Sequence, residues 1–224
     1  MKTFEVVSLD MFQTLVNVDS RREQVWTSIL SEKYTQESAE QYAQLLLQYF
    51  MEHWKQLKET KRFHFTREVY ERSFESVFQR FNIEFDVEEA CNILFQEHTK
   101  AELYEDTVRF LDRILKQYKV CIVSDADEAM IPQFYTKYGI RNFISEHYQS
   151  YKNDEDNLMF KELLHFYKVH PSKVIHIGDS ESDIIGAHRE GIRTCWLNRD
   201  KRTWEHEIKP DFVIESLNDL KQIL

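Results

Sequence analysis

Glycine and proline are scarce in this sequence, with 4 and 3 copies among 224 residues. Because these two residues mark most turns and flexible linkers, their scarcity excludes a chain dominated by loops and predicts many helices. The 42% of hydrophobic residues is typical of a globular protein. The length suits one large domain, or one domain that carries a sizeable insertion, and either can bury a substantial apolar core.

Cysteine is also rare, and its three copies are odd in number, widely spaced and set among apolar neighbours: Cys91, Cys121 and Cys195. This pattern argues against a disulfide framework and predicts buried thiols in a reducing cytoplasm. We expect no signal peptide, because the apolar stretch in the first ten residues, MKTFEVVSLD, is too short and ends in an acid. Long hydrophobic runs are missing too, and no window approaches the length of a transmembrane span.

Runs of lysine and arginine are absent, and 39 acidic residues against 29 basic ones give a formal net charge of −10. This charge repels nucleic acid and anionic membranes at long range. We therefore expect neither nucleic acid nor a membrane among the partners. The composition leaves the oligomeric state open.

Five short apolar runs predict strands buried on both faces, because their apolar residues are continuous rather than alternating. The runs are residues 6–9, 120–123, 174–177, 194–197 and 212–214. Between the later runs, apolar residues recur at helical spacing in residues 131–138 and 159–167. Strands that alternate with helices predict the α/β class, here a Rossmann-like doubly wound, mostly parallel sheet.

The interval between the first strand and Val120 is long, and its apolar residues follow helical spacing. Three such stripes lie at residues 42–54, 70–81 and 87–95. We expect Thr66 to be the N-cap of the second of these helices. The pattern predicts a helical bundle over residues 17–103, inserted into a Rossmann-like core of residues 1–16 and 104–224.

Polar residues follow the predicted strands, at the edge where ligands bind to open parallel sheets. The first strand ends in Asp10 and the second in Ser124. The third is followed by Asp179, with Asp183 four residues further on, and Lys152 lies in a loop between the second and third strands. We therefore expect carboxylates, a hydroxyl and an amine to converge on one edge of the sheet.

Taken in chain order, these residues form four short motifs. The motifs are Asp10-Met11-Phe12-Gln13-Thr14-Leu15, Ser124, Lys152, and Gly178-Asp179-Ser180-Glu181-Ser182-Asp183. This ordered set resembles the four motifs of the haloacid dehalogenase superfamily, and the resemblance covers essentially the whole chain. The helical insertion matches the cap domain that many members place after the first strand.

The resemblance implies a hydrolase with a role for each motif. Asp10 would be the catalytic nucleophile and form a covalent ester or phosphate that water then hydrolyses. Lys152 would also be catalytic, because its ammonium neutralises the anionic intermediate and orients the nucleophile. Ser124 would hydrogen-bond the transferred group together with Lys152, and Thr14 would hold the loop and contact a phosphoryl oxygen.

Asp179 and Asp183 add two carboxylates to Asp10, against only Lys152 as an obvious counter-charge. Like charges at one site raise pKa values or recruit a cation, and Mg²⁺ prefers oxygen ligands of this kind. The resemblance implies that Asp10, Asp179 and the backbone carbonyl of Phe12 bind the ion, and that Asp183 does so directly or through water. The alternative for Asp183 is a stabilising negative charge at the N-terminus of the following helix.

Two residues depart from the superfamily pattern. Its phosphatases usually carry a second aspartate two residues after the nucleophile, which protonates the leaving alkoxide, but Phe12 occupies that position here. Such proton transfer is typically worth about 10²- to 10⁴-fold in rate. The glycine that usually follows is replaced by Gln13.

Three functions remain open at this point. The acidic fourth motif favours a phosphatase that acts on a small phosphorylated metabolite with Mg²⁺. Phe12 favours a 2-haloacid dehalogenase, because dehalogenases have an aromatic residue there and need neither a leaving-group proton nor a metal. Asp125, however, replaces the asparagine that dehalogenases typically place after the serine. The third possibility is a weakly active or non-catalytic member that binds a phosphorylated ligand.

Residues outside the motifs carry weaker expectations. Arg21 and Arg22, with the face of residues 49–54, are candidates for recognising the substrate from the insertion. His176 lies inside the predicted third strand, where we expect a hydrogen-bonded core histidine rather than a catalytic base. Asp125 is one candidate source of the leaving-group proton.

Overall fold

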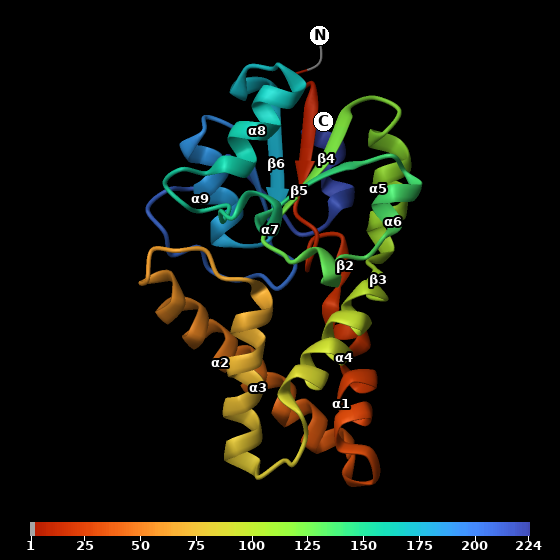
Figure 1. Cartoon of the computed structure of the whole chain (residues 1–224). Helices are drawn as coiled ribbons and strands as arrows, with labels where there is room; N and C mark the ends of the chain where they lie inside the picture. Colours follow the sequence, from red (N-terminus) through yellow and green to blue (C-terminus); the bar gives the residue numbers. More distant parts are fainter. Residues whose placement is uncertain (1–2) are drawn as a thin grey trace. The chain divides into compact units, whose positions relative to one another are not determined.

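The computed structural model describes residues 3–224, which form two compact units (Figure 1). The first unit contains the chain up to Asn17 together with Leu103–Asp125 and Phe134–Leu224. The second contains Val18–Glu102 and Ala126–Gln133. Across residues 3–224, every helix is too short or too polar to cross a membrane.

The first unit is built on a sheet of six strands in the order β5-β4-β1-β6-β7-β8, and all of its strand pairs are parallel. The strands are β1 (Val6–Leu9), β4 (Lys119–Ser124), β5 (Arg141–Ile144), β6 (Val174–Gly178), β7 (Arg193–Leu197) and β8 (Phe212–Ile214). This topology confirms the predicted α/β, Rossmann-like doubly wound sheet. Figure 1 shows β1 between β4 and β6, so the residues that follow these three strands meet at one edge.

Helices and short 3₁₀ turns connect the strands of this unit. They are α5 (Glu105–Ile114), α6 (Phe134–Lys137), α7 (Ser145–Tyr148), α8 (Leu158–Tyr167), η4 (Pro171–Lys173), α9 (Glu181–Arg189) and η5 (Leu217–Gln222). One apolar core includes residues from β1, β4, β6 and α8, among them Val6, Cys121, Phe160 and Val174. The sheet is therefore packed as a buried parallel sheet requires.

The sequence prediction fails in two places of this unit. Strand β5 goes unpredicted, because Arg141 and Asn142 interrupt the apolar run that marks the other strands. The helix predicted over residues 131–138 is wrong in extent, since only Phe134–Lys137 is α-helical. Pro132 follows Ile131 and excludes the helical backbone there, and Ile131 accordingly adopts extended angles of φ −81° and ψ 126°.

The second unit is helical. It contains η1 (Val18–Arg21), α1 (Arg22–Leu30), η2 (Ser31–Lys33), α2 (Gln36–Lys58), α3 (Thr66–Phe81), α4 (Val87–Thr99) and η3 (Glu128–Met130). The stripes predicted from helical spacing form its core, in which Trp26, Phe74 and Cys91 are buried. Two short strands, β2 (Val16–Asn17) and β3 (Glu102–Leu103), pair where the chain leaves and re-enters the first unit.

Helix α3 does not start as predicted. Thr66 is its first residue rather than its N-cap, and Phe65 precedes it in extended conformation. The backbone N–H groups of Thr66 and Arg67 donate to the two carboxylate oxygens of Asp127, at 2.9 and 2.8 Å. The helix is capped by a residue 60 positions away, which no local sequence pattern reveals.

Candidate active site

Asp10 lies directly after β1, and its backbone N–H donates to the carbonyl of Ile177 in β6 at 2.9 Å. The Asp10 residue is buried and only 4% exposed. The Ser124 hydroxyl and the Lys152 ammonium both donate to the same carboxylate oxygen, Oδ1, at 2.9 and 2.7 Å. Three residues that the sequence places on separate segments therefore meet, as predicted from the strand order.

Lys152 is buried, and hydrogen bonds hold both its backbone and its side-chain ammonium. Its backbone N–H donates to the Asp125 carboxylate at 2.8 Å, and its Nζ donates to Asp183 as well as to Asp10. A Cβ atom on Gly186 would lie 2.0 Å from the Lys152 carbonyl oxygen. Glycine in helix α9 thus allows the lysine loop to approach, a requirement that the sequence pattern does not indicate.

Asp183 is completely buried beside the strand β6. Its Oδ1 lies 3.0 Å from His176 Nε2, and its Oδ2 accepts the Ser180 N–H at 3.0 Å. The other ring nitrogen of His176 lies 2.9 Å from the Ser8 hydroxyl, which confirms the prediction of a hydrogen-bonded core histidine. A Cβ on Gly178 would lie 2.2 Å from Asp183 Cγ, so only glycine fits at that position.

Asp179 follows β6 and is held through its backbone. Its carbonyl accepts the indole N–H of Trp196 at 2.9 Å and a guanidinium N–H of Arg202 at 2.7 Å. Arg202 also lies 3.6 Å from the Asp179 carboxylate. Sequence reasoning misses both partners, because they lie in later segments with no motif to connect them to Asp179.

Burial and neighbouring charges shift the pKa values of the site in opposite directions. Burial, followed by the charges of Asp10 and Asp183, raises the pKa of Asp179 to about 7. Burial also raises the pKa of Asp10, although Lys152 acts against it. Burial acts to raise the pKa of Asp183 too, but Lys152 and His176 outweigh it and hold that pKa below the usual range.

The pKa of Lys152 is raised by its neighbours. Burial by itself disfavours its charged form, but the carboxylates of Asp10 and Asp183 outweigh burial and raise its pKa. Lys152 is therefore a fixed positive charge rather than a base. The carboxylates of Asp10 and Asp183 add to the effect of burial on the pKa of Asp179, while the positive charges of Lys152 and Arg202 act against it.

The donor set fits a divalent cation. Carboxylate oxygens of Asp10, Asp179 and Asp183 lie within 4.8 Å of one another. Magnesium prefers oxygen ligands, and a cation among these groups would remove the like-charge conflict seen at Asp179. The additional ligand expected from the Phe12 carbonyl stays a prediction.

The loop after Asp10 contains Gln13 at the position where the superfamily pattern usually has glycine. Gln13 has φ +58°, in the left-handed region that glycine adopts without strain. Thr14 is fully buried, and within residues 3–224 its hydroxyl has no hydrogen-bond partner. A contact between Thr14 and a phosphoryl oxygen stays a prediction.

The weaker candidates are engaged in contacts of their own. Within the helical unit, Arg21 donates twice to Glu97, at 2.9 and 2.7 Å, and Arg22 pairs with Asp19. Asp125 accepts the Lys152 N–H, as described above, so its carboxylate has a positioning role in addition to any role as proton donor.

The sequence is similar to a known protein family and to several of its relatives. The sequence profile of the family described as haloacid dehalogenase-like hydrolase matches residues 10–197. The pyrimidine 5'-nucleotidase YjjG of Escherichia coli (strain K12) is 43% identical over 54 residues, or 24% of each chain. The (S)-2-haloacid dehalogenase 2 of Pseudomonas sp. (strain CBS-3) is 36% identical over 58 residues, or 25% of each chain. The aligned stretch thus spans about a quarter of the length of either relative.

A solved structure is similar over the full length. YfnB from Bacillus subtilis, determined with bound magnesium, has a TM-score of 0.83 to this chain at 19% identity. The match covers 100% of this chain and 99% of the YfnB chain. This likeness shows that the two proteins share a fold.

Proposed function

Because the chain belongs to the haloacid dehalogenase-like hydrolase family, we propose that it is a Mg²⁺-dependent phosphatase that acts on a small phosphorylated metabolite. The observation that carries the proposal is the meeting of Asp10, Asp179 and Asp183 around a single lysine, with the pKa of Asp179 raised to about 7. A site with this surplus of negative charge suits a cation and the phosphoryl group that the cation would neutralise. The local match to a nucleotidase supports the same chemistry.

The hydrogen bonds of Asp10 assign its two oxygens different roles. Ser124 and Lys152 both donate to Oδ1, which leaves Oδ2 as the attacking atom. Oδ2 forms a bond to phosphorus while the bond from phosphorus to the leaving alkoxide breaks, and an aspartyl phosphate results. Water then attacks this phosphorus, releases inorganic phosphate and restores the Asp10 carboxylate.

The remaining residues hold and neutralise the reacting groups. Lys152 keeps its positive charge next to Asp10 and stabilises the negative charge that the transferred group carries. Asp179 and Asp183, with Asp10 and the Phe12 carbonyl, would hold Mg²⁺, which supplies further positive charge to the phosphoryl oxygens.

The lack of an acid at position 12 restricts the substrates that the protein can hydrolyse quickly. Without a carboxylic acid there, the leaving alkoxide lacks the usual proton donor of the family's phosphatases. We therefore expect aryl and acyl phosphates, whose leaving groups need little protonation, to react faster than alkyl phosphates. We also propose a cytoplasmic location, because the three cysteines are buried free thiols.

A phosphate-release screen tests the proposal. Aryl, acyl and alkyl phosphates are incubated with the protein in the presence of Mg²⁺ and, separately, with EDTA. We expect release with Mg²⁺ and none with EDTA, and we expect Asp10→Asn to be inactive in both. Release that is indifferent to EDTA, or equal in the Asp10→Asn variant, would contradict the proposed function.

Phe12 supports a second candidate, a 2-haloacid dehalogenase, in which the Asp10 carboxylate attacks carbon and halide departs without a proton. The local match to a haloacid dehalogenase is consistent with it. The measurement is halide release from short 2-haloacids without added metal. Halide release at a rate unaffected by EDTA, together with no phosphate release, would replace the phosphatase by this function.

A further inference from the structure

The loop of residues 11–16, which follows the nucleophile, contains a strained backbone conformation. Gln13 has φ +58°, and its N–H donates to the Val16 carbonyl at 2.8 Å to close the turn. Residues other than glycine adopt this region at an energetic cost and persist in it where surrounding contacts hold them. The contacts that hold Gln13 therefore bear on the position of Asp10, three residues earlier.

The segment that enters helix α5 contacts this loop at three points. The Tyr104 hydroxyl donates to Gln13 Oε1 at 2.6 Å. The Tyr104 N–H and the Thr107 hydroxyl both donate to the Leu15 carbonyl, at 3.1 and 2.8 Å. The same segment therefore holds both the Gln13 side chain and the backbone of the loop.

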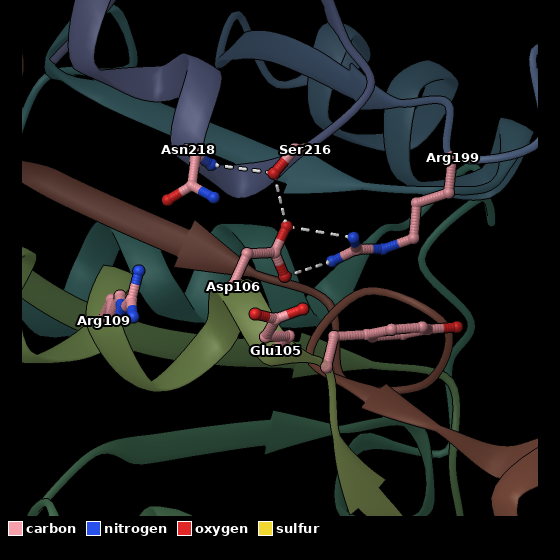
Figure 2. A pocket seen from close by; sticks show the side chains of 7 residues that line it. Glu105, Asp106, Arg109, Arg199, Ser216 and Asn218 are labelled. Carbon is pink, nitrogen blue, oxygen red and sulfur yellow. Dashed lines mark hydrogen bonds and ion pairs between the residues drawn. The ribbon is translucent and has the colours of Figure 1, made fainter.

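Arg199 adds a fourth contact from the loop after β7. Its Nη2 donates to the Thr14 carbonyl at 3.0 Å, and its guanidinium lies over the Tyr104 ring, 4.0 Å from the centroid. Both of its terminal nitrogens also pair with Asp106, each at 3.0 Å. Figure 2 shows Asp106 between Arg199 and Ser216, whose hydroxyl donates to the same carboxylate at 2.7 Å.

We propose that Tyr104 and Arg199 are positioning residues, which hold the nucleophile loop in the left-handed conformation at Gln13 and thereby fix the Asp10 carboxylate against Lys152. The inference rests on the proposed role of Asp10 as nucleophile. An arginine is required, because only a planar guanidinium can pair with a carboxylate in two places, stack on a ring and reach a carbonyl at once. A lysine at this position keeps the charge but makes fewer of these contacts.

Kinetics of conservative variants test the inference. Tyr104→Phe removes one hydroxyl and keeps the ring under the guanidinium, while Arg199→Lys keeps the charge. We expect each to lower kcat by about 10- to 100-fold, with KM changed less than about twofold, because misplacement of a nucleophile slows chemistry more than it weakens binding. In a Gln13→Gly background, glycine adopts the left-handed conformation unaided, so adding Tyr104→Phe should lower kcat by less than about twofold.

The chain offers a matched control at another edge of the sheet. Arg193 also pairs with an aspartate, Asp211, at 3.0 Å and lies over an aromatic ring, that of Phe212. Arg193→Lys should leave kcat unchanged, so a loss confined to Arg199→Lys cannot come from losing an arginine on a ring in general.

Hydrogen exchange gives a second measurement that does not need activity. The amides of Gln13, Leu15 and Val16 are hydrogen-bonded within the loop, and we expect the peptide covering residues 11–16 to exchange faster in Tyr104→Phe and Arg199→Lys but not in Arg193→Lys. Should the parent protein release neither phosphate nor halide, the proposed function fails, while the exchange data still decide this inference. Unchanged exchange and unchanged kcat in Tyr104→Phe would overturn it, as would an undiminished effect of Tyr104→Phe in the Gln13→Gly background.

Discussion

Phe12 is the residue that most sharply separates the candidate functions of this site. It stands two positions after Asp10 and forms an isolated parallel bridge with Val16, so its backbone belongs to the nucleophile loop while its side chain brings no acid to the site. The proton for a leaving alkoxide then has to come from another group or from solvent. Replacement of this one side chain can therefore separate a phosphatase that lacks an acid from a protein that only binds phosphorylated ligands.

We expect Phe12→Asp to raise kcat for alkyl phosphates by at least about tenfold in the presence of Mg²⁺, because a positioned carboxylic acid contributes about 10²- to 10⁴-fold in favourable cases. Rates of aryl phosphate release should rise less, since that leaving group needs little protonation. Phe12→Asn has nearly the same shape as the aspartate without its acidity and should give no comparable gain. Equal rates in the two variants would show that the missing acid does not limit turnover.

At the scale of elements, the N-terminus of α3 depends on a distant carboxylate. Asp127 is 4% exposed and accepts two backbone N–H groups of the first turn, whereas most N-caps come from the residue next to the helix. Helix α4 shows the ordinary arrangement, because the exposed Asp86 accepts one N–H, from Glu89 at 2.8 Å. The two aspartates form a natural comparison within one helical unit.

Asp127→Ala should lower the free energy of unfolding by about 2 kcal/mol, because it leaves two N–H groups at the buried end of a helix without their acceptor. Asp86→Ala should cost about 0.5 to 1 kcal/mol, since water replaces the carboxylate at an exposed helix end. Urea denaturation followed by circular dichroism measures both values. Equal losses in the two variants would show that the distant cap stabilises α3 no more than a local one.

At the scale of the whole molecule, one buried histidine links stability to pH. His98 in α4 is 5% exposed, and burial lowers its pKa from 6.5 to about 4, with Asp19 acting weakly in the opposite direction. Between these values the unfolded chain binds a proton that the folded protein does not. The stability contributed by neutral His98 is therefore complete above pH 6.5 and is lost as the pH falls towards 4.

We expect the free energy of unfolding to fall by about 3 kcal/mol over this range on account of His98 alone. His98→Phe should remove most of that pH dependence, whereas His165→Phe should leave it intact, because the His165 side chain is 82% exposed. Urea denaturation at several pH values between 7 and about 4 gives the comparison. A parallel pH profile for the parent and His98→Phe would assign the loss to other groups.

Most of the fold follows from patterns along the sequence, because apolar runs and helical spacing report which segments are buried and in what form. All five predicted strands are present, from Val6–Leu9 to Phe212–Ile214, as are the helices behind the three predicted stripes. These patterns do not predict strand β5 or the start of helix α3. The first has polar residues within it, and the second is capped by Asp127, whose contact joins residues far apart in the chain.

The residue types of the candidate site follow from the sequence, since Asp10, Ser124 and Asp179 end or directly follow strands whose order brings them to one edge, and Lys152 and Asp183 lie in a loop and a helix beside them. Only the tertiary structure decided how these groups act on one another. Burial and the distances among the carboxylates raise the pKa of Asp179, and both quantities are set by packing. The tertiary structure alone also decides the contacts of Tyr104 and Arg199 with the nucleophile loop, because these contacts join segments of the chain that no sequence motif relates.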